Sequence, residues 1–358
     1  SRHADVKKSF PRGPYLSWSE DPTTTITISY ASNKTEPDSI YYGCGSEPVS
    51  MVNTGPGTEK VITLRGLNPS TSYYYKIGSE GRIHSFKTAP DVSQPFKFVV
   101  YGDYAQLGNK QIKQQLYSAI MAEKPDFILF PGDLVANGNL PRAWKRDFFD
   151  YIKDFWASLP LMAVPGNHDG TGALFKYYLH YPQNRTWYRF NYSNALFLAV
   201  NTQAKFTAGS PQHKFITETL RSDKSDWKFV YLHKPPYSTN ACHHSNLKVR
   251  SLLCPIFEKY EIDVVFCGHN HAYERTLPIR KNRVDLENGI TYITSGGGGA
   301  ILKPFIPYRK LTRWEKQWSK VRIKDYHYLR VMVAGNTLVI EAKNLANDVI
   351  DRYEKVKG

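Results

Sequence analysis

Short apolar runs recur along the last three quarters of the chain, and amphipathic stretches separate several of them. Five runs, at residues 96–101, 127–130, 161–164, 229–232 and 264–266, are rich in β-branched or aromatic residues. Runs of this length and composition predict buried strands. Three stretches predict helices: 108–124, where Ile112, Leu116 and Ile120 have helical spacing, 142–159, and 247–260. Pro255 predicts a kink or a break in the last of these helices.

The first quarter of the chain has a different pattern. Apolar and polar residues alternate at 23–31, 39–43, 59–64 and 71–78, and Gly, Pro and Asn separate these segments. Short alternating strands of this kind predict a β-sandwich. No group of chemically reactive residues occurs here, so we expect a structural or docking module.

The two patterns predict two domains, residues 1–95 and 96–358. The second is expected to be an α/β domain of two packed mixed sheets with flanking helices. Residues 327–335 and 337–344 read as an antiparallel pair that returns to a sheet. Residues 301–325 are basic and aromatic and fit no neighbouring period. A loop near a functional site and a solvated surface both remain open for them.

Polar residues follow each of the five predicted strands. They lie in the motifs YGD ending at Asp103, PGDL around Asp133, GNHD at 166–169, YLH ending at His233, and GHNH at 268–271. Open α/β sheets bind ligands at the carboxyl ends of their strands. Asp, Asn and His supply the oxygen and nitrogen donors that divalent metals need. In extended backbone, His269 and His271 point the same way, so they can face neighbouring ions.

In this order the motifs resemble those of the calcineurin-like metallophosphoesterases, specifically the purple acid phosphatase branch with its GD, GDxxY, GNH(D/E), xxxH and GHxH. The runs HKPPYS at 233–238, GHNHAYERT at 268–276 and SGGGGA at 295–300 are also similar to that branch. LNPSTSYYY, at 67–75, resembles the tyrosine corner of fibronectin-III domains. The resemblance implies a fibronectin-III-like β-sandwich followed by a four-layer αββα domain.

The resemblance also implies a dinuclear metal site. Asp133 would bridge two ions; Asn167, His233 and His269 would complete one site, M2. Asp103 and His271 would join Asp133 at the other, M1. The ions would be divalent or trivalent iron, zinc or manganese. The implied activity is hydrolysis of phosphate esters, monoesters first and diesters as an extension, by a hydroxide that the metals generate.

The sequence departs from that branch at M1. Ala136 stands where GDxxY has its metal-binding Tyr, and Ala105 stands where non-purple relatives have a ligand His. We therefore expect a weak M1 that prefers a hard, labile divalent ion, and a protein without purple colour. Tyr104 and Asn137 remain open as substitute ligands, although each has the wrong alternation for a strand-end ligand.

Other polar residues are candidates for contact with the substrate. His168 is expected to assist the transferring phosphoryl group, or else to buttress Asp169. By resemblance to plant enzymes, one of the pair His243 and His244 contacts phosphate, and we favour His244. Arg275 either steers an anion or pairs with Glu274 or Asp169.

Composition adds limits on the partners. The 358 residues carry a formal net charge of +15, which favours encounter with a phosphorylated small molecule or a phosphoprotein, or simply reflects a basic solvated surface. No nucleic-acid-binding motif occurs, and no run of 18 apolar residues predicts a membrane span. No signal peptide is visible, but the chain begins at Ser1, which suggests processing or trimming. The oligomeric state is not indicated.

Cysteines and sequons bear on the compartment. Cys242 and Cys254 could pair, whereas Cys44 and Cys267 read as small buried residues. Three sequons begin at Asn33, Asn184 and Asn191. With the resemblance, these features favour a secreted or periplasmic glycoprotein with a disulfide bond. The alternative to an enzyme is a catalytically weak or inactive protein that binds a phosphorylated ligand through a degraded M1.

Overall fold

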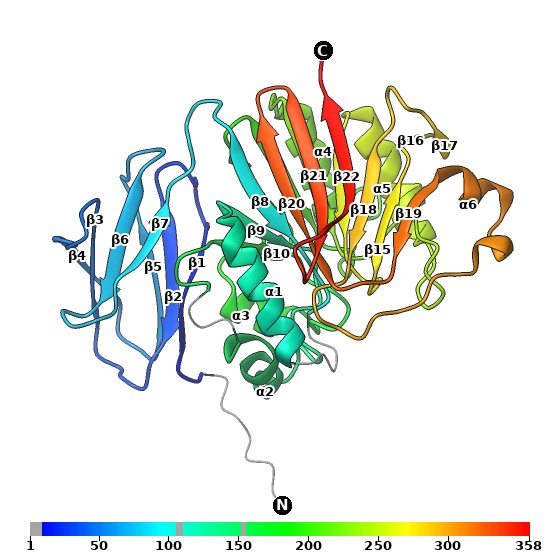
Figure 1. The fold of residues 1–358 in the computed structure, drawn as a ribbon. Helices are drawn as coiled ribbons and strands as arrows, with labels where there is room; N and C mark the ends of the chain where they lie inside the picture. Colours follow the sequence, from blue (N-terminus) through cyan, green and yellow to red (C-terminus); the bar gives the residue numbers. More distant parts are fainter. Residues whose placement is uncertain (1–8, 105–109, 152–154) are drawn as a thin grey trace, which may run out of the picture.

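The computed structural model describes residues 9–104, 110–151 and 155–358. A small β-sandwich packs beside a larger α/β domain (Figure 1). The sandwich pairs a three-stranded sheet with a four-stranded sheet, both antiparallel. In spatial order the strands are β1 (Arg12–Ser17), β2 (Ile26–Ala31) and β5 (Glu59–Leu64), then β4 (Ser50–Asn53), β3 (Ser39–Gly43), β6 (Ser72–Ile77) and β7 (His84–Lys87).

The expected sandwich is therefore present, including its corner. The hydroxyl of Tyr73 accepts a hydrogen bond of 2.9 Å from the backbone N–H of Asn68, as a tyrosine corner requires. The predicted domain split at residue 95 lies between β7, the last sandwich strand, and β8, which enters the second domain.

The second domain contains two large mixed sheets. The six-stranded sheet has the order β10 (Leu161–Ala163), β9 (Phe127–Phe130), β8 (Phe96–Val100), β20 (His327–Ala334), β21 (Thr337–Asn344) and β22 (Val349–Val356). The seven-stranded sheet has the order β11 (Tyr188–Tyr192), β12 (Ala195–Val200), β13 (Trp227–Leu232), β14 (Val264–Cys267), β18 (Thr291–Ser295), β15 (Tyr273–Thr276) and β19 (Ser319–Ile323). A small hairpin joins β16 (Ile279–Arg280) to β17 (Arg283–Val284).

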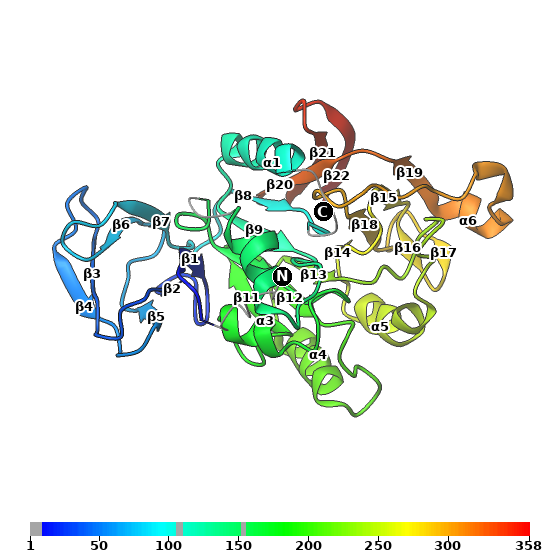
Figure 2. The same ribbon diagram turned by 90° about the horizontal axis from the view of Figure 1, so that it is seen from below.

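Helices cover the outer faces of both sheets, which makes four layers (Figure 2). Helix α1 (Lys110–Glu123) contacts β20 of the six-stranded sheet. Helices α4 (Pro211–Ser222) and α5 (Leu247–Lys259) lie on the seven-stranded sheet. Between the sheets the ring of Phe98 lies 5.1 Å from that of Phe197 and 5.6 Å from that of Phe229. The expected αββα architecture is confirmed, with its aromatic core between the sheets.

Two helix predictions need correction. In the described part of the helix expected at 142–159, helical structure is limited to α2 (Pro141–Ala143) and the π-helix η1 (Trp144–Phe149), and residues 152–154 lie outside the described residues. Further along the chain, the backbone carbonyls bond to the sandwich. The carbonyl of Trp156 accepts a hydrogen bond from Leu16 N–H, and the carbonyl of Ala157 accepts one from the Tyr75 hydroxyl. Helix α5 continues through Pro255. Pro255 and Ser251 are both exposed, so water can replace the bond that proline cannot make.

The segment 301–325 is ordered rather than a plain loop. It contains a 3₁₀ turn, η2 (Tyr308–Lys310), helix α6 (Arg313–Trp318) and strand β19. A capping box at Thr312 and Glu315 starts α6. Helix α3 (Ala173–Tyr178) is a further short helix that the periodicity did not predict.

All four cysteines are free. The expected pairing of Cys242 with Cys254 is absent, since Cys242 is exposed in a loop and Cys254 is buried in α5. Cys267 is buried as expected, but Cys44 is exposed, because it lies beyond the end of β3. Among the described residues, the helices are too short or too polar to cross a bilayer.

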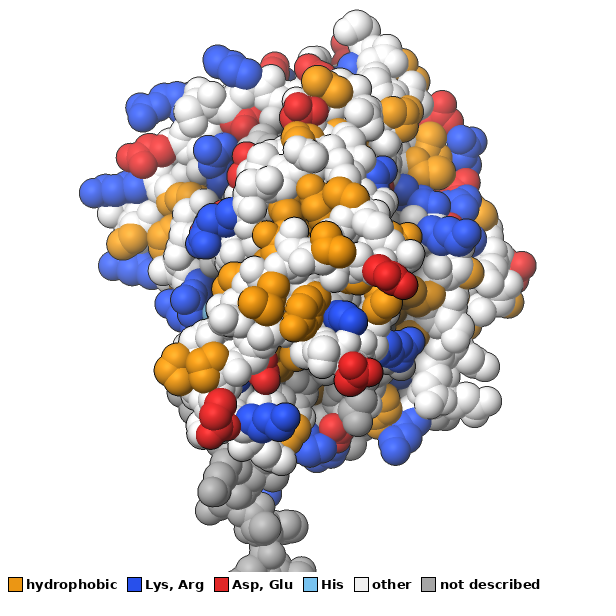
Figure 3. Space-filling model, turned by 90° about the vertical axis from the view of Figure 1, so that its left-hand side faces the viewer, with side chains coloured by type: hydrophobic (Ala, Val, Ile, Leu, Met, Phe, Trp, Pro, Cys, Tyr) orange, Lys and Arg blue, Asp and Glu red, His pale blue; other side chains and the backbone are white. Residues whose placement is uncertain are grey.

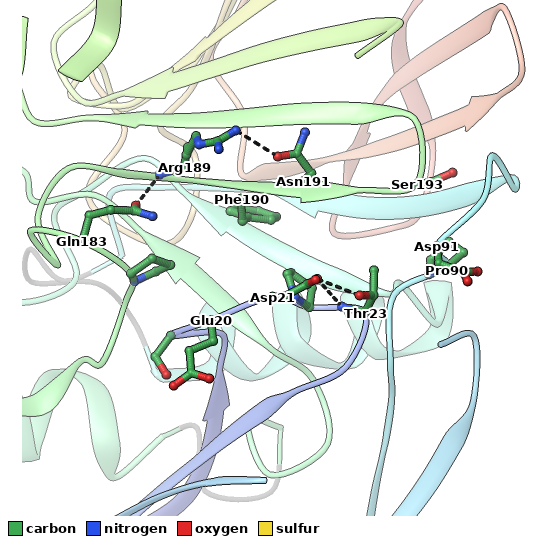
Figure 4. A pocket seen from close by; sticks show the side chains of 13 residues that line it. Glu20, Asp21, Thr23, Pro90, Asp91, Gln183, Arg189, Phe190, Asn191 and Ser193 are labelled. Carbon is green, nitrogen blue, oxygen red and sulfur yellow. Dashed lines mark hydrogen bonds between the residues drawn. The ribbon is translucent and has the colours of Figure 1, made fainter. Parts of the chain in front are cut away.

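A pocket of about 460 Å³ opens where the two domains meet (Figure 4). Its lining includes Glu20 and Asp21 from the sandwich and Arg189 and Asn191 from β11. Asp21 already accepts hydrogen bonds from Thr23. None of the strand-end motif residues lines this pocket. On the outer face of the sandwich, basic side chains are interleaved with acidic and apolar ones rather than gathered in one patch (Figure 3).

Candidate metal centre

The ends of five strands from both sheets meet at one place. Asp103, Asp133 and Asn167 follow β8, β9 and β10, which are neighbours in the six-stranded sheet. His233 follows β13 and the GHNH motif follows β14, its neighbour in the seven-stranded sheet. Because the two sheets are stacked, these ends form a common edge, the location expected for a ligand site in an α/β fold.

The donor atoms form two groups that share one carboxylate. Atoms of Asp133, His233 and His269 all lie within 4.8 Å of one another, and so do atoms of Asp103, Asp133 and His271. The Asn167 side-chain oxygen lies 2.9 Å from His233 Nε2, beside the first group. All six predicted ligands are thus brought together, and Asp133 occupies the position between the two groups.

The backbone at these residues is unusual. Asp103, Asp133 and His269 have φ angles of 60°, 60° and 71°. Non-glycine residues seldom adopt this left-handed conformation, and such strain concentrates at functional sites. Hydrogen bonds hold the turns: His269 N–H donates to Asp103 Oδ2 and His168 N–H donates to Asp133 Oδ1, both at 2.8 Å.

Close backbone packing explains the glycine of GNHD. A Cβ on Gly166 would lie 2.1 Å from Asp133 Oδ1. Asp169, the last residue of the motif, is fully buried. It accepts backbone hydrogen bonds from Gly166 and Asp133, at 2.8 and 2.9 Å, and from Leu134 at 2.8 Å. The carboxylate of Asp169 thereby fixes the loop that carries Asp133.

Backbone carbonyls orient two of the imidazoles. His233 Nδ1 lies 2.9 Å from the carbonyl of Pro131, and His271 Nδ1 lies 2.8 Å from that of Ile301. A carbonyl only accepts, so each Nδ1 donates and each Nε2 is directed to the cluster. This arrangement is how proteins orient histidine ligands of a metal.

Burial and neighbouring charges set the protonation states. Burial, with repulsion from His233, lowers the pKa of His269 to about 2, and burial lowers the pKa of His271 to about 4. Both rings are therefore neutral, the form that binds metals. Burial opposes ionisation of Asp133, but His233 beside it lowers that pKa to about 2. Burial also raises the pKa of Asp103 well above its usual range.

One buried atom indicates what the cluster lacks. Asp103 Oδ1 is inaccessible to solvent and has no hydrogen-bond partner. An unsatisfied buried carboxylate oxygen is costly, and cations satisfy such groups. His233 differs from the other two rings, because burial opposes its protonation but Asp133 and Asp103 raise its pKa to about 9. Two carboxylates, three imidazoles and an amide oxygen form a donor set that suits hard or borderline divalent ions. The residues present therefore fit a pair of metal ions.

The two substitute ligands considered for M1 are engaged elsewhere. The Tyr104 hydroxyl accepts from Tyr117 at 2.9 Å, and the Lys113 ammonium lies 4.0 Å from the centre of the Tyr104 ring. Asn137 is exposed, and its side-chain oxygen accepts from the N–H of Asn139. Ala105 lies outside the described residues. Among the described His, Cys, Asp and Glu residues, the M1 group consists of Asp103, Asp133 and His271.

The three histidines proposed to meet the substrate are placed differently. His168 is half-buried, and its Nδ1 lies 3.2 Å from the Ala136 carbonyl. The ring of His243 lies 4.1 Å from that of His269. His244 is exposed, and its backbone pairs with Thr239. The geometry therefore favours His243 over His244.

Arg275 is remote from these roles. Its guanidinium binds Asp351 at 2.6 and 2.9 Å, so it pairs with neither Glu274 nor Asp169. Glu274 instead accepts from Ser238 and Thr239, in the loop that carries His243.

The sequence left open whether residues 301–325 form a loop near the site or a solvated surface, and the structure brings residues 300–303 to the site. Ala300 N–H donates to the Asp103 carbonyl at 3.0 Å and Lys303 N–H donates to the His271 carbonyl at 2.9 Å. The Lys303 ammonium also contributes to lowering the pKa of His243, after burial. The one feature of the sequence that pointed to this role was the position of residues 300–303 at the end of the SGGGGA run at 295–300. These residues have no hydrophobic periodicity from which their structure could be predicted.

Comparisons with known proteins agree with this geometry. Residues 86–273 match the family model described as calcineurin-like phosphoesterase, and residues 11–98 match that of the purple acid phosphatase N-terminal domain. The chain is 30% identical to purple acid phosphatase 21 of Arabidopsis thaliana, over 72% of this chain and 60% of that protein. It is 27% identical to acid phosphatase type 7 of Mus musculus, over 77% of this chain and 71% of that protein.

A solved structure supports the fold. The purple acid phosphatase from yellow lupin seeds superposes with a TM-score of 0.84 at 21% identity, covering 96% of this chain and 74% of the lupin chain. The chain thus spans about 60% of the length of the Arabidopsis relative and about three quarters of the lupin protein.

Proposed function

The chain belongs to the calcineurin-like phosphoesterase family, and from this premise we propose that it hydrolyses phosphate monoesters at a dinuclear metal centre. Metal-dependent hydrolysis of phosphoric esters is the activity of its relatives, which are named acid phosphatases. The observation that carries the proposal is the pair of donor groups that share Asp133. A single site would need no carboxylate shared between two groups of donors.

The proposed mechanism assigns each residue a task. Two bound ions would supply Lewis acidity, polarising the phosphate and activating water for in-line attack. Asp133 would hold both ions; Asn167, His233 and His269 would complete M2, and Asp103 and His271 would complete M1. Asp169 holds the Asp133 loop rigid through its backbone bonds. A site whose ligands are held in place in this way before the reaction can stabilise the charge that develops in the transition state.

His168 and His243 are proposed to contact the substrate. The Nδ1 of His168 lies 3.2 Å from the Ala136 carbonyl, in the loop that follows Asp133, which places the ring where it can contact the phosphate or the leaving oxygen. The ring of His243 lies 4.1 Å from that of His269, and we propose that a phosphate oxygen accepts a hydrogen bond from it. Both could donate a proton to the leaving group when protonated.

A second candidate function rests on Ala136. With three donors, M1 would be occupied only in excess metal, and a protein with M2 alone filled would bind phosphorylated ligands without turnover. Iron, zinc and manganese are the proposed metals.

An extracytoplasmic location is also a proposal. Of the glycosylation sequons, the one at Asn33 has an exposed asparagine, which a glycan could reach. At Asn191 the side-chain amide already donates hydrogen bonds to Asp223 and Ser225.

The test combines metal analysis with two substrates. We expect the protein, supplied with Mn²⁺ or Zn²⁺, to hydrolyse p-nitrophenyl phosphate faster than bis-p-nitrophenyl phosphate. Asp133→Asn removes the shared negative charge, so metal should be lost and turnover should fall about a thousandfold, or about 4 kcal/mol of barrier. Asp91→Asn, an exposed carboxylate in the interdomain pocket, is the matched control. Near-normal turnover by the Asp133 variant would refute the dinuclear site, and phosphate binding without turnover in wild type would favour the second candidate.

A further inference from the structure

A basic pocket lies on the loop that leaves the metal centre. It has a volume of about 360 Å³ and is lined by Asn137, Leu140, Arg142, Ala143 and Arg146. The first two residues belong to the loop that follows Asp133, and the other three lie on α2 and η1. None of the six predicted metal ligands lines the pocket, and the side-chain oxygen of Asn137, considered above as a substitute ligand, accepts from Asn139 N–H. The catalytic scheme above makes no use of the pocket.

Contacts tie this pocket to the candidate centre. Asn137 is four residues from Asp133, so their Cα atoms are at most about 15 Å apart. The neighbouring Ala136 carbonyl contacts the His168 ring at 3.2 Å, and Gly138 N–H donates to the His168 carbonyl at 2.7 Å. One wall of the pocket is therefore the same loop that contacts His168.

Of the two arginines in the pocket, Arg146 is paired with a carboxylate, whereas Arg142 is not paired with one among the described residues. Arg146 binds the carboxylate of Asp147 at 2.5 and 2.9 Å, and Asp147 also accepts from Ala136 N–H at 3.1 Å. Arg142 is exposed, and within the described part of the chain it has neither an ion pair nor a side-chain hydrogen bond. The two are four positions apart, which places them on the same side of a helical turn. The pocket thus presents one uncompensated guanidinium beside a second that is fixed in place.

An arginine fork matches the oxygens of a phosphate group, and paired arginines give geometric selectivity. We propose that the pocket of Asn137, Arg142 and Arg146 binds a second phosphate of the substrate while the first lies at the metal centre. The preferred substrates are then small organic bisphosphates whose two groups are separated by a short carbon chain. This inference rests on the proposed function, because it takes the metal centre as the place of cleavage.

Fructose 1,6-bisphosphate and fructose 6-phosphate are a suitable pair of probes, since they differ by one phosphate. We expect wild type to have a higher kcat/KM for the bisphosphate, and Arg142→Ala to reduce that preference about tenfold, mainly through KM, as loss of a charged hydrogen bond predicts. Arg142→Lys should retain part of it. Arg283→Ala, an exposed arginine in β17, should keep the wild-type preference.

A preference that is equal in wild type and Arg142→Ala, or absent in wild type, would overturn the pocket as a phosphate subsite. Calorimetric titration with fructose 1,6-bisphosphate separates this result from failure of the proposed function. Binding that weakens about tenfold in Arg142→Ala, together with no turnover of any ester by metal-loaded wild type, would support the subsite and overturn the hydrolase. Binding that is unchanged in the variant would overturn the subsite whatever the turnover.

Discussion

At the scale of single residues, two features characterise the candidate centre: strained backbone at three of its residues, and an alanine, Ala136, at a position where a metal ligand is expected. Three of its residues, Asp103, Asp133 and His269, have positive φ angles. Asp103 Oδ1 is buried without a hydrogen-bond partner among the described residues and lies 3.6 Å from His271 Nε2. Ala136, which is half-buried beside His168, contributes no donor atom from its side chain.

Ala136→Tyr should strengthen M1, because a phenolate would add a donor to a group of three. We expect calorimetric metal titration to resolve a weak and a tight site in wild type, and two tighter sites in the variant. With iron the variant should also gain a visible charge-transfer band that wild type lacks. Ala136→Phe is the matched control, since it adds the ring without the oxygen. Equal affinity of Tyr and Phe variants would mean that position 136 does not reach M1.

At the scale of elements, a buried carboxylate connects β15 to the loop that carries His243. Glu274 accepts from Thr239 N–H at 3.0 Å and from the Ser238 hydroxyl at 3.1 Å. Ser238 also accepts from the side-chain amide of Asn270, within the GHNH motif. Residue Glu274 therefore positions the loop relative to the metal centre without touching it.

Glu274→Gln should loosen this loop, because an amide cannot accept from both hydroxyls and the backbone as a carboxylate does. Charged hydrogen bonds contribute about 1.5–3 kcal/mol each, so we expect a lower melting temperature and a raised KM for p-nitrophenyl phosphate with a smaller change in kcat. Glu218→Gln, at an exposed residue of α4, serves as control. A fall confined to kcat, with KM unaltered, would contradict a positioning role.

At the scale of the whole molecule, an aromatic cluster joins the two domains. The ring of Trp18, just after β1, lies 5.5 Å from that of Phe127 and 5.6 Å from that of Phe190, both in the catalytic domain. The Tyr15 hydroxyl donates to the carbonyl of Tyr178 at 2.6 Å. Because these groups are buried, the sandwich and the catalytic domain are expected to unfold together.

Trp18→Ala should cost about 3–5 kcal/mol through the cavity it leaves, and it should separate the unfolding of the domains. Differential scanning calorimetry is expected to give one transition for wild type and two for the variant. Val49→Ala, at a side chain that is 85% exposed on the sandwich, should leave a single transition. One unshifted transition in the Trp18 variant would show that this contact does not couple the domains.

Acid should destabilise the fold through a buried histidine in β20. Burial lowers the pKa of His327 to about 4 from its ordinary 6.5. Below pH 6.5 the unfolded chain takes up a proton that the folded chain does not, so stability falls as the pH drops from 6.5 to 4, by about 3 kcal/mol in total. His327→Gln should make the melting temperature fall less between pH 7 and pH 4.5. Parallel pH profiles for the two proteins would exclude this contribution.

The sequence alone determined what depends on local pattern. Alternation of apolar and polar residues predicted the sandwich, because a strand with one buried face has an apolar side chain at every second position. Short apolar runs predicted the buried strands that precede Asp103, Asp133 and His233. The ordered motifs, with their resemblance, named six residues that the fold brings together.

Only the tertiary structure decided what depends on contacts between distant segments. It bonded the carbonyls of Trp156 and Ala157, within the predicted helix 142–159, to the sandwich, and it kept Cys242 and Cys254 apart. It also turned His243 rather than His244 toward His269, and brought residues 300–306 to the carbonyls of Asp103 and His271. These choices follow from packing across the two sheets, and no local period encodes such packing.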